Sequence, residues 1–102
     1  MEPSEDLVRD ENDLRWEVGI PYTRAILGDR VDLELLDEEI RVEIPPGTQP
    51  GDEILVPGKG VSYVGRPGRG DLYVVARVAL PRSLDDEERD LLERLDRLRR
   101  ER

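Results

Sequence analysis

Apolar and polar residues alternate along several stretches of the chain, which is the pattern of β-strands that bury one face and expose the other. The first stretch covers residues 14–20, where the even-numbered residues are apolar and Arg15 and Glu17 lie between them. Trp16 shares the period of its apolar neighbours, so we interpret it as a core residue rather than a binding platform. The alternation recurs over residues 31–35 and 40–44, which predicts two further half-buried strands.

The segment between these two strands, Asp37–Glu39, predicts a hairpin turn. Because it contains no glycine, we expect a longer loop built on a type I turn rather than a two-residue primed turn. Opposite charges on the outward faces of the two strands suit antiparallel pairing. A short strand is expected at 54–56. The segment 72–80 is apolar on both faces, so we expect a central strand that is covered on both sides.

A short helix is predicted after the first strand. Residues 21–27 can form one or two helical turns that end at Gly28. So short a helix is marginal alone, and we expect packing of Tyr22, Ile26 and Leu27 onto the sheet to hold it.

The last segment of the chain has the strongest helical pattern. Asp85 is a good N-cap residue, and Glu88 occupies the capping-box position. Acidic residues at the start and arginines near the end match the helix macrodipole. The apolar stripe of this helix needs burial against either the sheet of the same chain or a second copy, and it consists of Leu91, Leu92, Leu95 and Leu98.

Residues 44–60 are rich in proline and glycine, which predicts a rigid corner between two strands rather than a simple hairpin.

The Pro-Gly-Lys-Gly sequence at 57–60 lacks the spacing and the following helix of a phosphate-binding loop, so we interpret it as a turn. Arg-Gly-Asp at 69–71 is the tripeptide that cell-adhesion receptors recognise. Because it directly precedes a predicted strand, we do not interpret it as an adhesion site. The acidic runs at 37–39 and 85–88 are interpreted as turn and helix-start residues rather than catalytic acids.

Composition limits the chemistry that the chain can perform. Its 102 residues fit one small domain, and it contains neither cysteine nor histidine. Disulfides, thiolate sites and imidazole ligands are therefore impossible. A hard cation held by carboxylate oxygens stays open as an alternative, but the sequence has no calcium-loop spacing, and we expect no metal and no cofactor. No signal peptide or membrane-spanning run is visible in the sequence, so a cytoplasmic location is the default expectation.

The formal net charge of −9 is unevenly distributed, with −11 on residues 1–57, +4 on residues 58–82 and −2 on residues 83–102. Overall acidity argues against a dedicated nucleic-acid binder, which needs clustered lysine and arginine. We interpret the basic middle of the chain as a solvated face.

Once these motifs are set aside, the features that suggest a function are exposed strand edges and apolar side chains. They suit a protein that holds an extended polypeptide by main-chain hydrogen bonds.

Two glycine-rich blocks, residues 44–60 and 68–74, carry a resemblance to a known family. Together with the lead-in Arg9–Leu14 and the short helix at 25–28, they resemble the C-terminal substrate-binding region of DnaJ-family co-chaperones, specifically the second of its two β-domains. The resemblance extends from Arg9 to the end of the chain. Glu11, where the family often has glycine, departs from the pattern, as do the glycine-free turn and the proline at position 57.

The resemblance implies a mostly β fold, a small two-layer antiparallel β-sandwich-like domain with one short helix after the first strand and a C-terminal helix. It also implies a DnaJ C-terminal-type β-domain over 14–82 and a dimerisation helix over 83–102. Residues 1–13 are acidic and weakly apolar, so we expect an extended or disordered lead-in there. Because the His-Pro-Asp motif and the zinc-binding cysteine repeats of the family are missing, we expect no stimulation of a DnaK-type ATPase by these residues alone.

By this resemblance the chain is part of a co-chaperone that binds unfolded polypeptide, homodimerises and works with a DnaK-type chaperone. The dimer interface would fall on Leu91, Leu92, Leu95 and Leu98, and a client surface on Val31, Leu33, Ile40 and Val42. A purely structural dimerisation module with little client affinity is the alternative. An enzyme is not expected, since no activated nucleophile or general base is present.

Overall fold

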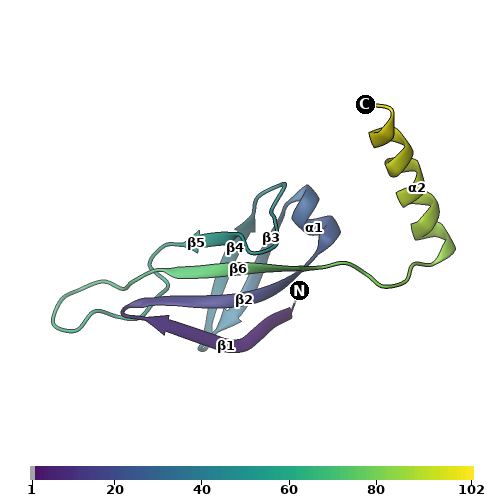
Figure 1. Cartoon of the computed structure of the whole chain (residues 1–102). Coiled ribbons are helices and arrows are strands. Elements are labelled where there is room, and N and C mark those ends of the chain that lie inside the picture. Colours follow the sequence, from purple (N-terminus) through teal and green to yellow (C-terminus); the bar gives the residue numbers. More distant parts are fainter. Residues whose placement is uncertain (1) are drawn as a thin grey trace.

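The computed structural model describes residues 2–102, with side chains from Leu7 onward. In chain order the elements are β1 (Glu2–Asp10), β2 (Asp13–Pro21), α1 (Tyr22–Leu27), β3 (Asp29–Leu35), β4 (Glu38–Ile44), β5 (Glu53–Val56), β6 (Leu72–Ala79) and α2 (Asp86–Arg100). A four-stranded sheet has the order β1-β2-β6-β5, and the β3–β4 hairpin forms a second sheet (Figure 1). This mostly β architecture, with a short helix after β2 and a C-terminal helix, confirms the predicted fold class.

The two central strands of the larger sheet, β2 and β6, run parallel, whereas its other pairs and the hairpin are antiparallel. Pairing of β2 with β6 runs without interruption from Leu14 opposite Leu72 to Pro21 opposite Ala79. The prediction that 72–80 forms a central strand is confirmed. Its second face is less covered than expected, since Tyr73 and Val75 are only half-buried.

The core lies between the two sheets and is built from the alternating faces that the sequence predicted. Trp16 is 4% exposed, which confirms it as a core residue. The buried apolar side chains are Leu14, Trp16, Val18, Ile20, Ala25, Leu35, Ile40, Val42, Ile44, Leu72, Val74 and Ala76. With no phenylalanine in the chain, aliphatic residues from both sheets supply nearly all of this buried surface.

The lead-in contributes a strand that the sequence analysis did not predict. β1 pairs antiparallel with β2, with Arg9 opposite Leu14. Its acidic, weakly apolar sequence gave no alternation to detect. Glu11, in the turn between the strands, has φ 55°, a left-handed conformation that favours glycine. Whether residues 1–13, 14–82 and 83–102 behave as separate units stays a prediction.

Helix α1 packs on the sheet through a different residue than expected. Ala25 is buried, whereas Ile26 and Leu27 are 59% and 65% exposed, so the predicted packing of those two side chains is wrong. The cause is backbone contact, because Gly47 and Thr48 donate hydrogen bonds to the carbonyl oxygens of Ile26 and Ala25. Only a small side chain fits where the helix approaches its support so closely.

The hairpin turn also differs from the expectation. Leu35 pairs directly with Glu38, which leaves a two-residue loop of Leu36 and Asp37 with φ 51° and 63°. Positive φ at both central residues is the geometry of a type I′ turn, so the predicted longer loop is wrong. Continuous pairing along β3 and β4 imposes the primed turn although no glycine is present.

The rigid corner predicted after 44 carries the chain from the hairpin to the larger sheet. Thr48 is buried at 6% exposure, and its hydroxyl donates to the carbonyl oxygen of Pro45 at 2.6 Å. Further along, Gly51 donates to Ala76 of β6 at 2.8 Å, and Ala76 donates back to Asp52 at 2.8 Å. These bonds fix β5 beside β6.

Three chain segments meet where Gly60 and Gly70 pass the carbonyl oxygen of Asn12, and we call this point the glycine crossing. A Cβ atom added to Gly70 would lie 2.0 Å from that oxygen, and one added to Gly60 would lie 2.4 Å from it. Val61 donates to the same oxygen at 2.8 Å, and Gly60 donates to Gly70 at 2.8 Å. Only glycine allows this approach, so these two glycines are required by packing rather than by a positive φ.

Gly70→Ala is therefore expected to destabilise the fold by about 3 kcal/mol or more, since backbone atoms must move to admit the methyl group. Gly65→Ala is the matched control, because Gly65 has φ 78° but open space around its Cβ position. The control should cost only about 1 kcal/mol, from backbone conformation alone. Urea unfolding of the three proteins measures both values, and equal costs would contradict the crossing as the source of the effect.

Candidate functional site

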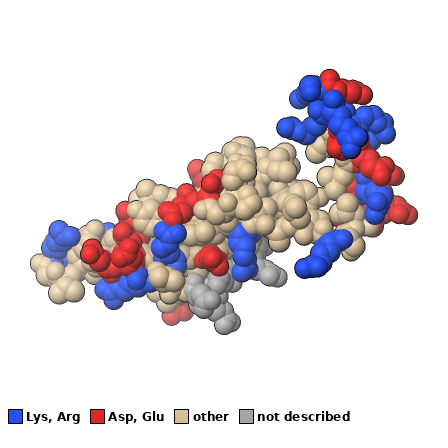
Figure 2. Space-filling model, viewed as in Figure 1, with Lys and Arg blue, Asp and Glu red and all other residues tan. Residues whose placement is uncertain are grey.

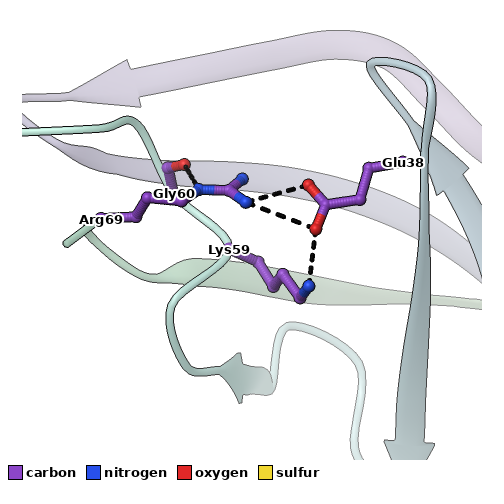
Figure 3. Close-up of polar contacts among 4 residues, drawn as sticks. All are labelled: Glu38, Lys59, Gly60 and Arg69. Atoms are coloured by element: carbon purple, nitrogen blue, oxygen red, sulfur yellow. Dashed lines mark hydrogen bonds and ion pairs between the residues drawn. The ribbon is translucent and has the colours of Figure 1, made fainter.

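The hairpin is tied to the glycine-rich loop by three charged residues, which we call the Glu38 clasp. Glu38 opens β4, and its carboxylate accepts hydrogen bonds from Lys59 Nζ at 2.5 Å and Arg69 Nη1 at 3.0 Å (Figure 3). Arg69 Nε also donates to the carbonyl oxygen of Gly60 at 3.0 Å. Lys59 and Arg69 flank the glycine crossing. The Glu38 clasp therefore holds the β3–β4 hairpin in a fixed position relative to the crossing.

These contacts change the acidity of Glu38. The hydrogen bond from Lys59, and next the one from Arg69, hold the pKa of Glu38 below its ordinary value of 4.5. All three side chains are about one-third exposed, between 34% and 36%. The clasp is thus a partly solvated bridge between the two sheets.

Three positive charges of the basic middle segment have partners within the same chain. Lys59 and Arg69 pair with Glu38, and the Arg66 guanidinium lies 4.1 Å from the centre of the Tyr63 ring. Asp71 also acts internally, since its carboxylate accepts from the Gly58 amide at 2.9 Å. Both charged side chains of the Arg-Gly-Asp sequence therefore have partners within the fold.

The hairpin brings the four predicted client residues together but not onto one free surface. Val31 lies opposite Val42, and Leu33 lies opposite Ile40. Ile40 and Val42 are each 1% exposed, so they belong to the core and offer no accessible surface. Val31 and Leu33 are half-buried at the margin of that core. The expected client surface therefore narrows to the β3 side of the hairpin.

Strand β3 has β4 as its one strand partner among the described residues, so its other edge is free for backbone hydrogen bonding. Along it, half-buried apolar residues alternate with exposed charged ones. On the outer face, Arg30 pairs with Glu43 and Asp32 with Arg41, at 3.0 Å and 3.2 Å. These ion pairs confirm the predicted cross-strand charge pairing at two positions. The third position brings Glu34 opposite Glu39 instead.

An open depression of about 670 Å³ lies where β3 begins and β4 ends. Its lining consists of Leu27, Gly28, Asp29, Arg30, Glu43, Ile44, Pro45 and Pro46. Leu27 from α1 and the two prolines of the corner supply apolar walls, and the Arg30–Glu43 ion pair supplies a charged rim. A side chain of an extended peptide can occupy such a depression while its backbone follows the strand edge.

Helix α2 stands away from both sheets at the end of the chain (Figure 1), and none of its residues is buried. The predicted capping box is confirmed, since Asp85 accepts from the Glu88 amide at 2.8 Å and Glu88 accepts from the Asp85 amide at 3.1 Å. Leu91, Leu95 and Leu98 are 58%, 47% and 47% exposed, and Leu92 is half-buried. The four leucines thus form an apolar surface that the chain's own sheets leave open.

Sequence reasoning missed the Glu38 clasp. It treated Glu38 as a turn residue and Lys59 as part of a glycine-rich turn, and the partners of Glu38 are 21 and 31 residues away in the sequence. No local pattern marks such a pairing.

Among the described residues, no helix has the length and apolar character needed to cross a membrane, and no three potential ligand side chains gather into a metal site.

Comparison with known proteins gives consistent matches. The family described as DnaJ C terminal domain matches residues 1–81. The chaperone protein DnaJ of Thermosynechococcus vestitus is 39% identical over all of this chain and 28% of its own length. Those of Halorubrum lacusprofundi and Bacteroides thetaiotaomicron are 40% and 39% identical over 83% and 93% of this chain, and over 22% and 24% of their own lengths. The chain thus spans about a quarter of these relatives.

Glu38→Gln is expected to lower stability at neutral pH, because it replaces the charged acceptor of two cations. Since folding lowers the pKa of Glu38, its stabilising effect is complete above pH 4.5 and is lost as the pH falls through the folded-state value. The difference in urea midpoint between wild type and variant should therefore shrink below pH 4.5. Glu39→Gln, which removes an exposed charge from the opposite face of β4, is the control. A difference that stays constant with pH would contradict this role of the carboxylate.

Proposed function

The chain belongs to the DnaJ C-terminal domain family, and we propose that it binds non-native polypeptide and self-associates through α2. The family is one of chaperone domains rather than enzymes, which agrees with the expectation that the chain has no catalytic site. We further propose that it acts within a DnaJ co-chaperone that delivers clients to a DnaK-type chaperone. A cytoplasmic location stays a prediction.

The free edge of β3 is the observation that carries the client-binding proposal. An extended client would pair its backbone with β3 and add a third strand to the hairpin sheet. Alternate client side chains would extend the row of Val31 and Leu33, while Ile40 and Val42 support that row from the core. Main-chain pairing is tolerant of sequence, as recognition of many unfolded clients requires.

The depression beside α1 lies at the start of β3, so one end of the free β3 edge leads into a partly apolar surface. It includes Asp29 and Arg30, the first residues of β3, together with Leu27 and two prolines. A client strand aligned on β3 would bring a side chain to this depression. The acidic outer face of the hairpin near Glu34 and Glu39 favours clients that carry basic residues between their apolar ones.

The leucine surface of α2 supports the second part of the proposal. A 15-residue helix is marginal in water unless its apolar side is covered. Full burial of a leucine contributes about 1.5–3 kcal/mol, so covering four of them by a second copy is a sufficient driving force. The alternative function, a structural module that dimerises without holding clients, rests on this same surface alone.

Leu33→Ser is expected to weaken client holding about tenfold, which corresponds to about 1.4 kcal/mol, because a hydroxyl interrupts the apolar row of β3. Light scattering of a denatured client diluted with each protein measures the suppression of aggregation. Glu17→Ser changes an exposed residue of β2, outside the hairpin, and is the control. If the wild type fails to suppress aggregation, the structural module is the correct function. If Leu33→Ser acts like wild type, the client lies elsewhere.

Leu95→Asp is expected to give a folded monomer, because an aspartate in the leucine surface would leave an unpaired carboxylate in the interface. The dissociation constant should rise about 100-fold or more. Glu93→Asp places the same residue on the opposite side of α2 and should leave association unchanged. Sedimentation across a range of concentrations measures both. A Leu95→Asp protein that still sediments as a dimer would place the contact outside α2.

A further inference from the structure

We infer that an extended client pairs antiparallel with β3 through the backbone groups of Arg30, Asp32 and Glu34, and that Glu34 selects a basic client residue beside the hairpin turn. This inference rests on the proposed client binding and names the class of segment that the β3 edge accepts. Such a segment alternates apolar and polar residues, and its polar row carries a lysine or an arginine.

The hairpin turn decides which backbone groups of β3 face the free edge. Its two-residue loop is closed by Leu35 and Glu38, which form a hydrogen-bonded pair. Hydrogen-bonded and non-hydrogen-bonded pairs alternate along an antiparallel ladder. The odd-numbered residues of β3 therefore direct their amide and carbonyl groups to β4. Those of Arg30, Asp32 and Glu34 point to the free edge, where a client backbone can pair with them.

An antiparallel client suits this edge better than a parallel one. Antiparallel pairs are slightly more stable per residue, and the hairpin beside the client is itself antiparallel. Client residues opposite Val31 and Leu33 then form non-hydrogen-bonded pairs, in which facing side chains lie closest together. These two half-buried residues therefore meet apolar client side chains, and the polar client row lies on the outer face.

The charges on the outer face of the hairpin differ along β3. Arg30 and Asp32 already have ion partners on β4, at 3.0 Å and 3.2 Å. Glu34 instead lies opposite Glu39. In the described part of the chain, neither of these two carboxylates forms an ion pair. A depression of about 440 Å³ at this end of β3 is lined by Asp32, Leu33, Glu34, Asp37 and Glu39.

A basic client residue opposite Glu34 removes an unfavourable feature of the hairpin. Like charges that face each other destabilise a sheet, whereas opposite charges stabilise it. The methylene stem of a lysine or arginine can lie along Leu33 while its charged group reaches the carboxylates of Glu34 and Glu39. Acidic and basic side chains are interspersed over the face of the β body that Figure 2 shows. The preference for a basic residue therefore comes from this one position, not from a wide acidic field.

Three labelled peptides test the charge preference. Each alternates serine and valine, and the middle residue of the serine row is replaced by lysine, glutamine or glutamate. Fluorescence anisotropy measures their affinities for the full chain. The lysine peptide should bind about twofold to fivefold more tightly than the glutamine peptide, and the glutamate peptide more weakly than both.

Two double variants locate this preference. In Glu34→Gln/Glu39→Gln, the lysine and glutamine peptides should bind equally. Glu17→Gln/Glu93→Gln removes two exposed charges outside the hairpin and should keep the preference of the wild type. A preference that persists in the first variant, or that is lost in the second, would overturn the selection by Glu34.

Backbone methylation of the lysine peptide tests the pairing itself. In the antiparallel arrangement, client residues of the polar row donate their amides to β3, and the amides of the valine row point away. Methylation of the polar-row amides should therefore abolish binding, whereas methylation of the valine amides should leave it nearly unchanged. The reverse pattern would show a parallel client, and no effect of either methylation would exclude strand addition. Both results would overturn the inference.

Failure of the inference can be distinguished from failure of the proposed function. If the three peptides bind the wild type with equal affinity, client binding stands and the charge selection is overturned. If none of them binds the wild type, and the denatured client also aggregates unhindered, the proposed client binding is overturned together with the inference.

Discussion

The close approach of Gly60 and Gly70 to the carbonyl oxygen of Asn12 is the constraint on which the rest of the β body depends. A side chain at either glycine would collide with backbone atoms, so the turn before β2 and both ends of the long loop are fixed at one point. Leu14 donates to Asp71 at 2.9 Å, and the Asp71 amide donates to the Asp13 carboxylate at 2.8 Å. These bonds bring β2 and β6, which are distant in sequence, into parallel register.

The Glu38 clasp extends this constraint to the hairpin, because Lys59 and Arg69 reach the hairpin from either side of the crossing. Core packing of Ile40 and Val42 then holds β4. Strand β3 is attached through β4, and its far edge is left without a partner strand in the described part of the chain. A firmly held strand with a free edge is a pre-organised surface, which lowers the entropic cost of ordering an incoming peptide.

Local sequence information was sufficient for elements whose apolar period is unbroken. The alternation of β2, β3 and β4, the apolar strand β6 and the capping box of α2 were predicted correctly, because each depends on neighbours within a few residues. The errors have long-range causes. The Leu36–Asp37 turn follows from continuous strand pairing, α1 is rotated by bonds from Gly47 and Thr48, and β1 is recruited by β2. The Glu38 clasp depends on residues that only the folded loop brings together.

The division of the chain into a β body and a detached helix separates two sources of stability. The body buries its own core, whereas α2 relies on its capping box, its charged ends and one intrahelical ion pair, Asp96–Arg100 at 3.1 Å. Exposed pairs of this kind contribute about 0.3–0.5 kcal/mol each, which cannot replace burial of four leucines. The self-association proposed for α2 would therefore be linked to the order of the helix, so a dilute chain should lose the helix before it loses the sheets. Under the proposed function, association through such a helix would join two free β3 edges without any change in the body that carries them.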